Sequence, residues 1–147
     1  MIAAGEEAPD FDGPTSTGTR FHLAGERGHP VVLYFFPKAD TPGCTAESKG
    51  FQEHLGELGG RDVRVVGVST DPLEAQKKFS AKYGFEFPLV ADPEKEIARK
   101  YGVLGLLGMA KRVTFLIGPD GRVRQVIDRM GADPHVAAAC DRSWSAP

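Results

Sequence analysis

Hydrophobic positions along the chain follow two periods, one typical of buried strands and one typical of amphipathic helices. Residues 31–36, VVLYFF, form an unbroken apolar run that is typical of a strand covered on both faces. Over 44–58, apolar or small residues recur at spacings of four and three, which predicts one face of a helix that ends at Gly59-Gly60. The chain is therefore expected to begin its main sheet with a central strand and a helix.

The same alternation of strand and helix continues to the C-terminus. Asp71-Pro72 and Asp92-Pro93 each place a capping acid before a proline, which is typical of a helix start. The turn Gly118-Pro119-Asp120-Gly121 separates two β-rich runs and predicts an antiparallel hairpin. These signals predict strands over 63–68, 87–91, 112–117 and 122–127, and helices over 72–83, 93–101 and 134–142.

The order of these elements, βαβαβαββα, predicts the fold class. Strands that alternate with helices pair in parallel and the closing hairpin pairs antiparallel, so we expect a mixed central β-sheet with helices on both faces. The expected fold is α/β, a thioredoxin-like layer sandwich. Because 147 residues is close to the usual length of one domain, residues 1–147 are expected to form a single domain.

Composition and charge narrow the possible partners. Eighteen basic and twenty acidic side chains leave a net charge of -2, which provides no basic surface for nucleic acid or an anionic membrane. The N-terminus lacks the features of a signal peptide and no apolar run is long enough to cross a membrane, so we expect a cytoplasmic protein. The only cysteines, Cys44 and Cys140, do not form the disulfide framework of a small secreted domain, so at least one is a candidate for reactivity.

Cys44 lies where chemistry gathers in open α/β sheets, beyond the carboxyl end of a central strand. Thr41 and Pro42 suit the cap and first position of the following helix, which puts Cys44 in the first helical turn. Unpaired backbone N–H groups and the helix dipole stabilise negative charge there, and such settings lower the pKa of a thiol from about 8.5 to about 3.5–7.5. Cys44 is therefore a candidate nucleophile.

A thiolate that attacks a peroxide needs hydrogen-bond donors for the two peroxide oxygens, because charge moves onto the leaving oxygen. The Thr41 hydroxyl, the N–H groups of Gly43 and Cys44, and one arginine are the candidate donors. Pro37 ends the strand without a competing N–H and suits the wall of a pocket that excludes water. The residue types around Cys44 thus fit peroxide chemistry.

The segment YFFPKADTPGCTAES resembles the active-site segment of peroxiredoxins, most closely of the bacterioferritin comigratory, or Q-type, subfamily. VVGVSTD, FPLVADPEKEIARKYGV and RVTFLIGPDGRV are similar to family segments in the same order, so the resemblance extends from about Pro9 to Val126. It implies a thiol-dependent peroxidase that reduces hydrogen peroxide and organic hydroperoxides through a cysteine sulfenic acid, without cofactor or metal, in antioxidant defence. It also implies an external thiol reductant, such as thioredoxin, glutaredoxin or a low-molecular-weight thiol, and a monomer or weak homodimer.

Residue by residue, the resemblance implies roles for five side chains. Cys44 would be the peroxidatic cysteine, and Thr41 and Pro37 would be the threonine and proline of the motif. Arg112 would be the arginine beside the thiolate. Glu47 would be the supporting group that orients Arg112.

The chain departs from the Q-type pattern at the second thiol. Many members carry a resolving cysteine five positions after the peroxidatic one, where this chain has Lys49, and others carry it on the next helix, where residues 73–83 contain none. Cys140 or an outside thiol would then reduce the sulfenic acid before over-oxidation. Val136, Ala139 and Cys140 recur at helical spacing, so a packing role for Cys140 stays open.

Three other kinds of site or function are alternatives to a peroxidase: a dithiol–disulfide oxidoreductase, a binding module, and a metal site or dyad. A dithiol–disulfide oxidoreductase needs a C-x-x-C pair, but Thr41 occupies the position of the second cysteine. The alternative is a non-catalytic thioredoxin-like binding module in which Cys44 is a relict. A metal site or dyad of Cys44 with His54 is not expected, because ten helical residues separate them by about 15 Å, and the other histidines, His135 among them, are scattered along the chain.

Overall fold

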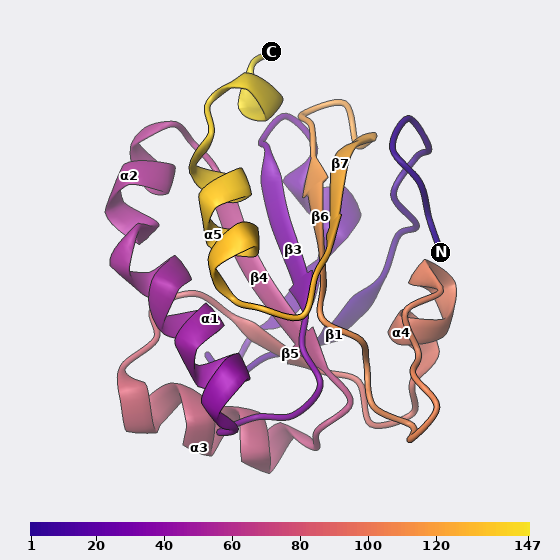
Figure 1. The fold of residues 1–147 in the computed structure, drawn as a ribbon, viewed down its shortest axis with the longest axis vertical. Helices are drawn as coiled ribbons and strands as arrows, with labels where there is room; N and C mark the ends of the chain where they lie inside the picture. The colour runs from indigo at the N-terminus through magenta and orange to yellow at the C-terminus, as the bar shows by residue number, and fades with distance from the viewer.

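A computed structural model describes residues 1–147, and Figure 1 shows its ribbon. Five strands form one sheet in the order β5-β4-β3-β6-β7. The strands are β3 Val31–Phe35, β4 Arg64–Ser69, β5 Leu89–Ala91, β6 Val113–Ile117 and β7 Val123–Asp128. β3, β4 and β5 pair in parallel, whereas β6 pairs antiparallel with both β3 and β7. The predicted mixed sheet with a closing hairpin is confirmed.

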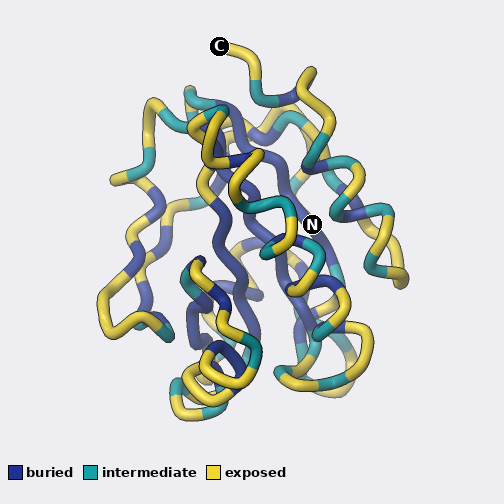
Figure 2. Tube along the Cα trace, turned by 90° about the vertical axis from the view of Figure 1, so that its left-hand side faces the viewer, coloured by how far each residue is buried: buried dark blue, intermediate teal, exposed yellow.

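Helices cover both faces of this sheet. They are α1 Pro42–Glu53, α2 Leu55–Gly60, α3 Leu73–Tyr83, α4 Glu96–Tyr101 and α5 Asp133–Cys140, with short 3-10 turns η1 Leu23–Glu26 and η2 Ser143–Ser145. Successive residues of β3 alternate between two cores, Val31 and Leu33 packing with residues of α4, and Val32 and Tyr34 with residues of α1, α3 and α5. Figure 2 accordingly shows buried segments through the middle of the molecule and exposed ones on the outside, so the layer sandwich is confirmed.

A second, two-stranded sheet was not predicted. It pairs β1 Asp12–Pro14 antiparallel with β2 Arg20–His22. Each strand has three residues, and Gly13 and Pro14 have little strand propensity, so the sequence carries only a weak signal. Gly13 is needed for packing, because a Cβ there would lie 2.7 Å from Cγ1 of Val90 on β5.

The helix predicted over 44–58 is two helices, α1 and α2, which meet at His54. The backbone of His54 departs from helical geometry, with φ −98° and ψ 6°. Three of the six residues of α2 are glycines, which do little to extend a straight helix, while Leu58 of α2 is fully buried in the core. The helix therefore breaks at His54, although Leu58 at the end of the predicted apolar stripe still reaches the core.

Asp92 caps α4, but not from the position that the sequence predicts. The helix begins at Glu96, after a turn that contains Pro93, rather than directly after Asp92. The two carboxylate oxygens of Asp92 accept hydrogen bonds from Ile97 N at 3.2 Å and Ala98 N at 2.9 Å. The predicted residue thus satisfies free N–H groups of the helix from three positions before the cap residue, Lys95.

Replacing Asp92 with alanine is expected to lower the free energy of unfolding by about 2 kcal/mol, because two buried N–H groups lose their acceptor. Urea denaturation measures the change. Glu94→Ala, an exposed carboxyl in the same turn, is the matched control, and it should change stability by less than about 0.5 kcal/mol. Equal stability of the two variants would contradict the capping role of Asp92.

Candidate active site

The loop between β3 and α1 is held in place by Asp71, at the end of the neighbouring strand β4. The sequence predicts Asp71 as the cap of α3, which is wrong, because Pro72 occupies the cap position. The Asp71 carboxylate instead accepts hydrogen bonds from Ala39 N at 2.8 Å and Ser69 Oγ at 2.6 Å. A residue that the sequence assigns to helix capping therefore positions the loop that leads to Cys44.

Asp40 gives the same loop a second anchor. Its backbone has φ 60°, in the left-handed region that aspartate tolerates better than most residues. Its carboxylate accepts hydrogen bonds from Lys82 Nζ and Tyr83 Oη of α3, each at 2.8 Å. The loop is thus tied to α3 as well as to β4.

Cys44 is the third residue of α1, as predicted, and it is fully buried. The N–H groups of Gly43 and Cys44 donate to no acceptor within the protein, because the helix has no earlier carbonyls to pair with them. The first turn of α1 therefore presents two free donors and the positive end of the helix dipole at the sulfur.

Thr41 occupies the cap position of α1 but does not cap it, so the predicted side-chain cap is wrong. The Thr41 hydroxyl donates its hydrogen to the carbonyl oxygen of Lys38 at 2.8 Å. In this geometry the hydroxyl oxygen is left as an acceptor. It suits the O–H of a hydroperoxide rather than a peroxide oxygen that needs a donor.

Arg112, just before β6, joins Cys44 to Glu47. Its Nη2 donates to Cys44 Sγ at 3.4 Å and its Nη1 donates to Glu47 Oε1 at 2.7 Å. Gly43 allows this approach, because a Cβ at that position would lie 2.8 Å from Arg112 Nη2. The long-range packing thus brings Arg112 to the two α1 side chains with which the resemblance associates it.

Glu47 is a buried carboxyl beside a buried thiol. Burial raises its pKa to about 8, although the charge and hydrogen bond of Arg112 oppose the shift. A carboxyl with this pKa is mostly protonated at pH 7. The positive charge of Arg112 is then not cancelled by Glu47 and acts mainly on Cys44.

His135 and Thr114 extend this buried polar group, although sequence reasoning singled out neither. His135, on α5, is fully buried, with Nδ1 2.7 Å from Thr114 Oγ1 and 3.5 Å from Glu47 Oε2. Its Nε2 lies 2.7 Å from the carbonyl oxygen of Arg129. Thr114 is the one polar residue in the buried strand β6, and that isolated hydroxyl is the signal that could have indicated a polar partner.

An open depression of about 340 Å³ lies beside Arg112. It is lined by Pro37, Lys111, Arg112, Asp128, Arg129 and Met130. The Arg112 side chain is 12% exposed, whereas Cys44 is covered. A small molecule from solvent would therefore reach the sulfur past Arg112 and Pro37.

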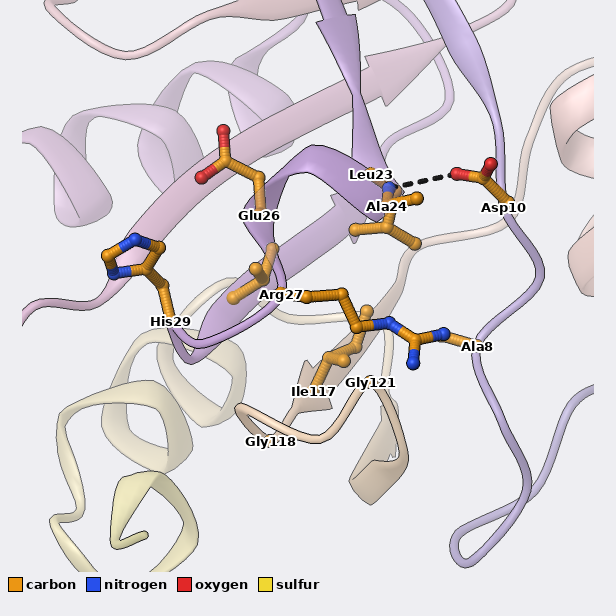
Figure 3. A pocket seen from close by; sticks show the side chains of 11 residues that line it. Ala8, Asp10, Leu23, Ala24, Glu26, Arg27, His29, Ile117, Gly118 and Gly121 are labelled. Carbon is orange, nitrogen blue, oxygen red and sulfur yellow. Dashed lines mark hydrogen bonds between the residues drawn. The ribbon is translucent and has the colours of Figure 1, made fainter.

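A second pocket, drawn in Figure 3, lies away from these groups. It encloses only about 20 Å³, between the η1 segment and the turn of the β6–β7 hairpin, and no cysteine lines it. Val31 lines it at the amino end of β3, the end opposite Pro37. Asp10 there accepts a hydrogen bond from Ala24 N at 2.9 Å, which ties η1 to the segment before β1.

Cys140 lies far from Cys44, beside His54 and Glu57 at the other end of α1. The possible ligand atoms of these three side chains lie within 4.8 Å of one another. Because His54 is ten residues from Cys44, about 15 Å separate the two ends of α1, against the roughly 7 Å between Cα atoms that a disulfide allows. Burial raises the pKa of the Cys140 thiol, with a further contribution from Glu57. Both cysteines are free thiols.

Comparison with known proteins identifies the family of this chain. The model of the AhpC/TSA family matches residues 4–126. Peroxiredoxin Bcp of Escherichia coli is 34% identical over 141 residues, which cover 91% of this chain and 90% of that protein.

None of the helices has the length and apolar character needed to span a membrane.

Two solved structures share the whole fold. Peroxidoxin BcpB of Mycobacterium tuberculosis has a TM-score of 0.88 and 38% identity and covers 95% of each chain. A bacterioferritin comigratory protein of Xanthomonas campestris, described for its alkyl peroxide reduction activity, has a TM-score of 0.85 and 34% identity over 93% of this chain and 94% of its own. The chain is thus similar to Q-type peroxiredoxins along almost its full length.

Proposed function

The chain belongs to the AhpC/TSA family and is a thiol-dependent peroxidase, and from that premise we propose that Cys44 is the residue that attacks the peroxide. The observation that carries this proposal is the contact of Arg112 Nη2 with Cys44 Sγ at 3.4 Å, at the free N–H groups that begin α1. The other thiol, Cys140, lacks such a helix start, and its pKa is raised by burial. A non-catalytic binding module is not favoured by the relatives.

The proposed reaction begins with the Cys44 thiolate and a hydroperoxide, ROOH. Sulfur attacks the terminal oxygen, an S–O bond forms, and the O–O bond breaks with its electron pair leaving on RO⁻. Cys44 is oxidised to a sulfenic acid that keeps the peroxide hydrogen, while RO⁻ takes a proton and leaves as water or an alcohol. Arg112 and the N–H groups of Gly43 and Cys44 stabilise the negative charge as it moves from sulfur to oxygen.

Thr41, Pro37 and Glu47 have supporting roles in this proposal. The Thr41 oxygen, whose own hydrogen is donated to Lys38 O, accepts the O–H of the hydroperoxide and so directs the terminal oxygen at sulfur. Pro37 lines the entrance and presents no N–H that would hold water. Glu47 keeps Arg112 in position through Nη1.

The sulfenic acid is reduced by an outside thiol in the route that we propose. Cys140 lies at the opposite end of α1 from Cys44. The position of a helical resolving cysteine is occupied by Lys49, so no second thiol of the chain lies near Cys44. A thioredoxin, a glutaredoxin or a low-molecular-weight thiol would then attack the sulfenic sulfur, forming a mixed disulfide and releasing water, and a second thiol of the reductant would cleave that disulfide and return Cys44 to the thiol. A one-cysteine route follows from this arrangement.

Treating the reduced protein with one equivalent of hydrogen peroxide tests both the site and the route. We expect the intact mass to increase by one oxygen, and a sulfenic-acid reagent to label the peptide that contains Cys44. A coupled assay with thioredoxin, glutaredoxin and glutathione then identifies the electron donor.

Loss of two hydrogens instead, with Cys44 and Cys140 joined in one peptide, would rule out the one-cysteine route while keeping Cys44 as the peroxidatic residue. Labelling of Cys140 alone would rule out the proposed site. The Cys140→Ser chain is the control, and it should gain the same single oxygen.

A further inference from the structure

The buried side of the site contains a polar contact, between Glu47 Oε2 and His135, that the reaction above does not use. Glu47 Oε2 is buried without a hydrogen-bond partner, and His135 Nδ1 lies 3.5 Å from it. Both side chains are fully buried, on α1 and α5. Buried polar atoms without partners are rare in proteins, so the arrangement points to a function for the pair.

The hydrogen bonds of His135 determine which ring nitrogen carries the proton. Nε2 lies 2.7 Å from the carbonyl oxygen of Arg129, which can only accept, so Nε2 carries a hydrogen. Burial lowers the pKa of His135, which favours the neutral ring. Nδ1 then carries a lone pair, which accepts the Thr114 hydroxyl at 2.7 Å and also faces Glu47 Oε2 at 3.5 Å.

The charge balance of the site decides what Glu47 does. The Cys44 thiolate and the Arg112 guanidinium cancel, so an ionised Glu47 beside them would leave a net negative charge in a buried site. Two arrangements are neutral, thiolate with protonated Glu47 and thiol with ionised Glu47, and they differ by one proton moved between the two side chains. The electron-rich Nδ1 of neutral His135 faces Glu47 Oε2 at 3.5 Å, so it disfavours negative charge on that oxygen and thereby favours protonated Glu47 with the reactive thiolate.

We propose that His135 is a positioning residue that holds Glu47 in its protonated form, so that the positive charge of Arg112 acts on the Cys44 thiolate. This inference rests on the proposed function, since it concerns the reactive form of Cys44. Gly50 makes the contact possible, because a Cβ on it would lie 2.8 Å from Val136 Cγ2, and glycine therefore lets α5 approach α1.

The other ionisable groups around the pair do not replace this contact. Asp128 and Arg129, at the end of β7, act on His135 with opposite charges. Burial raises the pKa of Tyr34 on β3 well above its usual value, and the nearby Glu47 and Cys44 raise it further, so Tyr34 stays neutral. Its hydroxyl is paired with Ser48 Oγ at 2.8 Å.

Replacing His135 with leucine in a Cys140→Ser chain tests the proposal through the pH dependence of Cys44 alkylation. Leucine places no nitrogen lone pair beside Glu47 Oε2, so ionised Glu47 is no longer disfavoured and the proton shifts to Cys44. We expect the pH midpoint of alkylation to rise by about one unit and the reaction with hydrogen peroxide at pH 7 to slow about tenfold. His135→Gln keeps a donor and an oxygen acceptor and should recover most of the rate, and His22→Leu, at an exposed histidine, should change neither.

A Glu47→Gln background separates this role from a purely structural one. The side-chain amide in this background carries no carboxyl proton for His135 to hold, so His135→Leu should no longer move the midpoint of Cys44 alkylation. An unchanged midpoint in folded His135→Leu, or an equal shift with and without Glu47, would overturn the proposal.

If His135→Leu does not fold, infrared spectroscopy of the wild-type protein tests the protonation of Glu47 on which the proposal depends. A protonated-carboxyl C=O band at pH 7 that disappears in Glu47→Gln is expected, and its absence would contradict the proposal. Alkylation needs no peroxide turnover, so these outcomes are independent of the peroxidase assay. Failure of the proposed function would instead appear as undiminished peroxide consumption by Cys44→Ser.

Discussion

Replacing Cys44 with serine is expected to abolish peroxide consumption and to leave the fold intact. A serine hydroxyl is almost entirely un-ionised at pH 7 and is a weak nucleophile, so the reaction should fall to the uncatalysed background, a loss of more than about 10³-fold. Serine is close to cysteine in size, and the free N–H groups at the start of α1 remain. We expect a cost of about 1–2 kcal/mol in unfolding free energy, from burying a hydroxyl.

Peroxide consumption in the presence of a thiol reductant measures the loss, and circular dichroism with urea denaturation checks the fold. Cys140→Ser is the matched control, since it makes the same change at the other cysteine. It should retain the wild-type rate of the first oxidation. Residual turnover of Cys44→Ser near the wild-type level would place the active site elsewhere.

Replacing Arg112 with methionine is expected to slow the reaction with peroxide by about 10²–10³-fold, because the leaving oxygen and the thiolate lose their charged donor. Methionine fills a similar volume along the wall of the depression. Glu47 loses its partner in this variant, but the folded protein should stay stable. Burial raises the pKa of Glu47 to about 8, so the side chain can remain a neutral acid at pH 7. The loss should therefore appear in the rate far more than in stability.

Stopped-flow oxidation of the reduced protein measures this effect directly. Arg112→Lys keeps the charge but not the two-pronged donation to Cys44 and Glu47, so its rate should fall between those of methionine and wild type. Arg99→Met on α4, where the arginine is exposed, is the matched control and should react at the wild-type rate. An Arg112→Met protein that reacts as fast as wild type would exclude Arg112 from the transition state.

The sequence alone predicts much of the fold because its signals act over short distances. The apolar run of β3, the helical spacing after it and the turn of the β6–β7 hairpin each depend on neighbouring residues, and the structure confirms them. The helix break at His54 and the three-residue strands β1 and β2 escape prediction, because the glycine-rich α2 and these short strands carry only weak local propensity, and the pairing of β1 with β2 depends on the tertiary fold.

The position of Cys44 in the first turn of α1, with Glu47 three residues later on the same helix, is also determined by local sequence. Local sequence does not determine which distant groups reach them. Asp71 holds the active-site loop instead of capping α3, and the Thr41 hydroxyl turns to Lys38 O. Each of these choices depends on which hydrogen-bond partners the folded chain brings within reach.

Only the tertiary structure decides how the two cysteines and the buried histidine are used. It separates Cys140 from Cys44 by the length of α1, and it sets His135 3.5 Å from Glu47, although the two lie far apart in the sequence. Glycine at position 50 permits that contact, since it lets α5 pack against α1. Sequence spacing determines which residues share a face, whereas the charge state of a buried site depends on which faces pack together and exclude water.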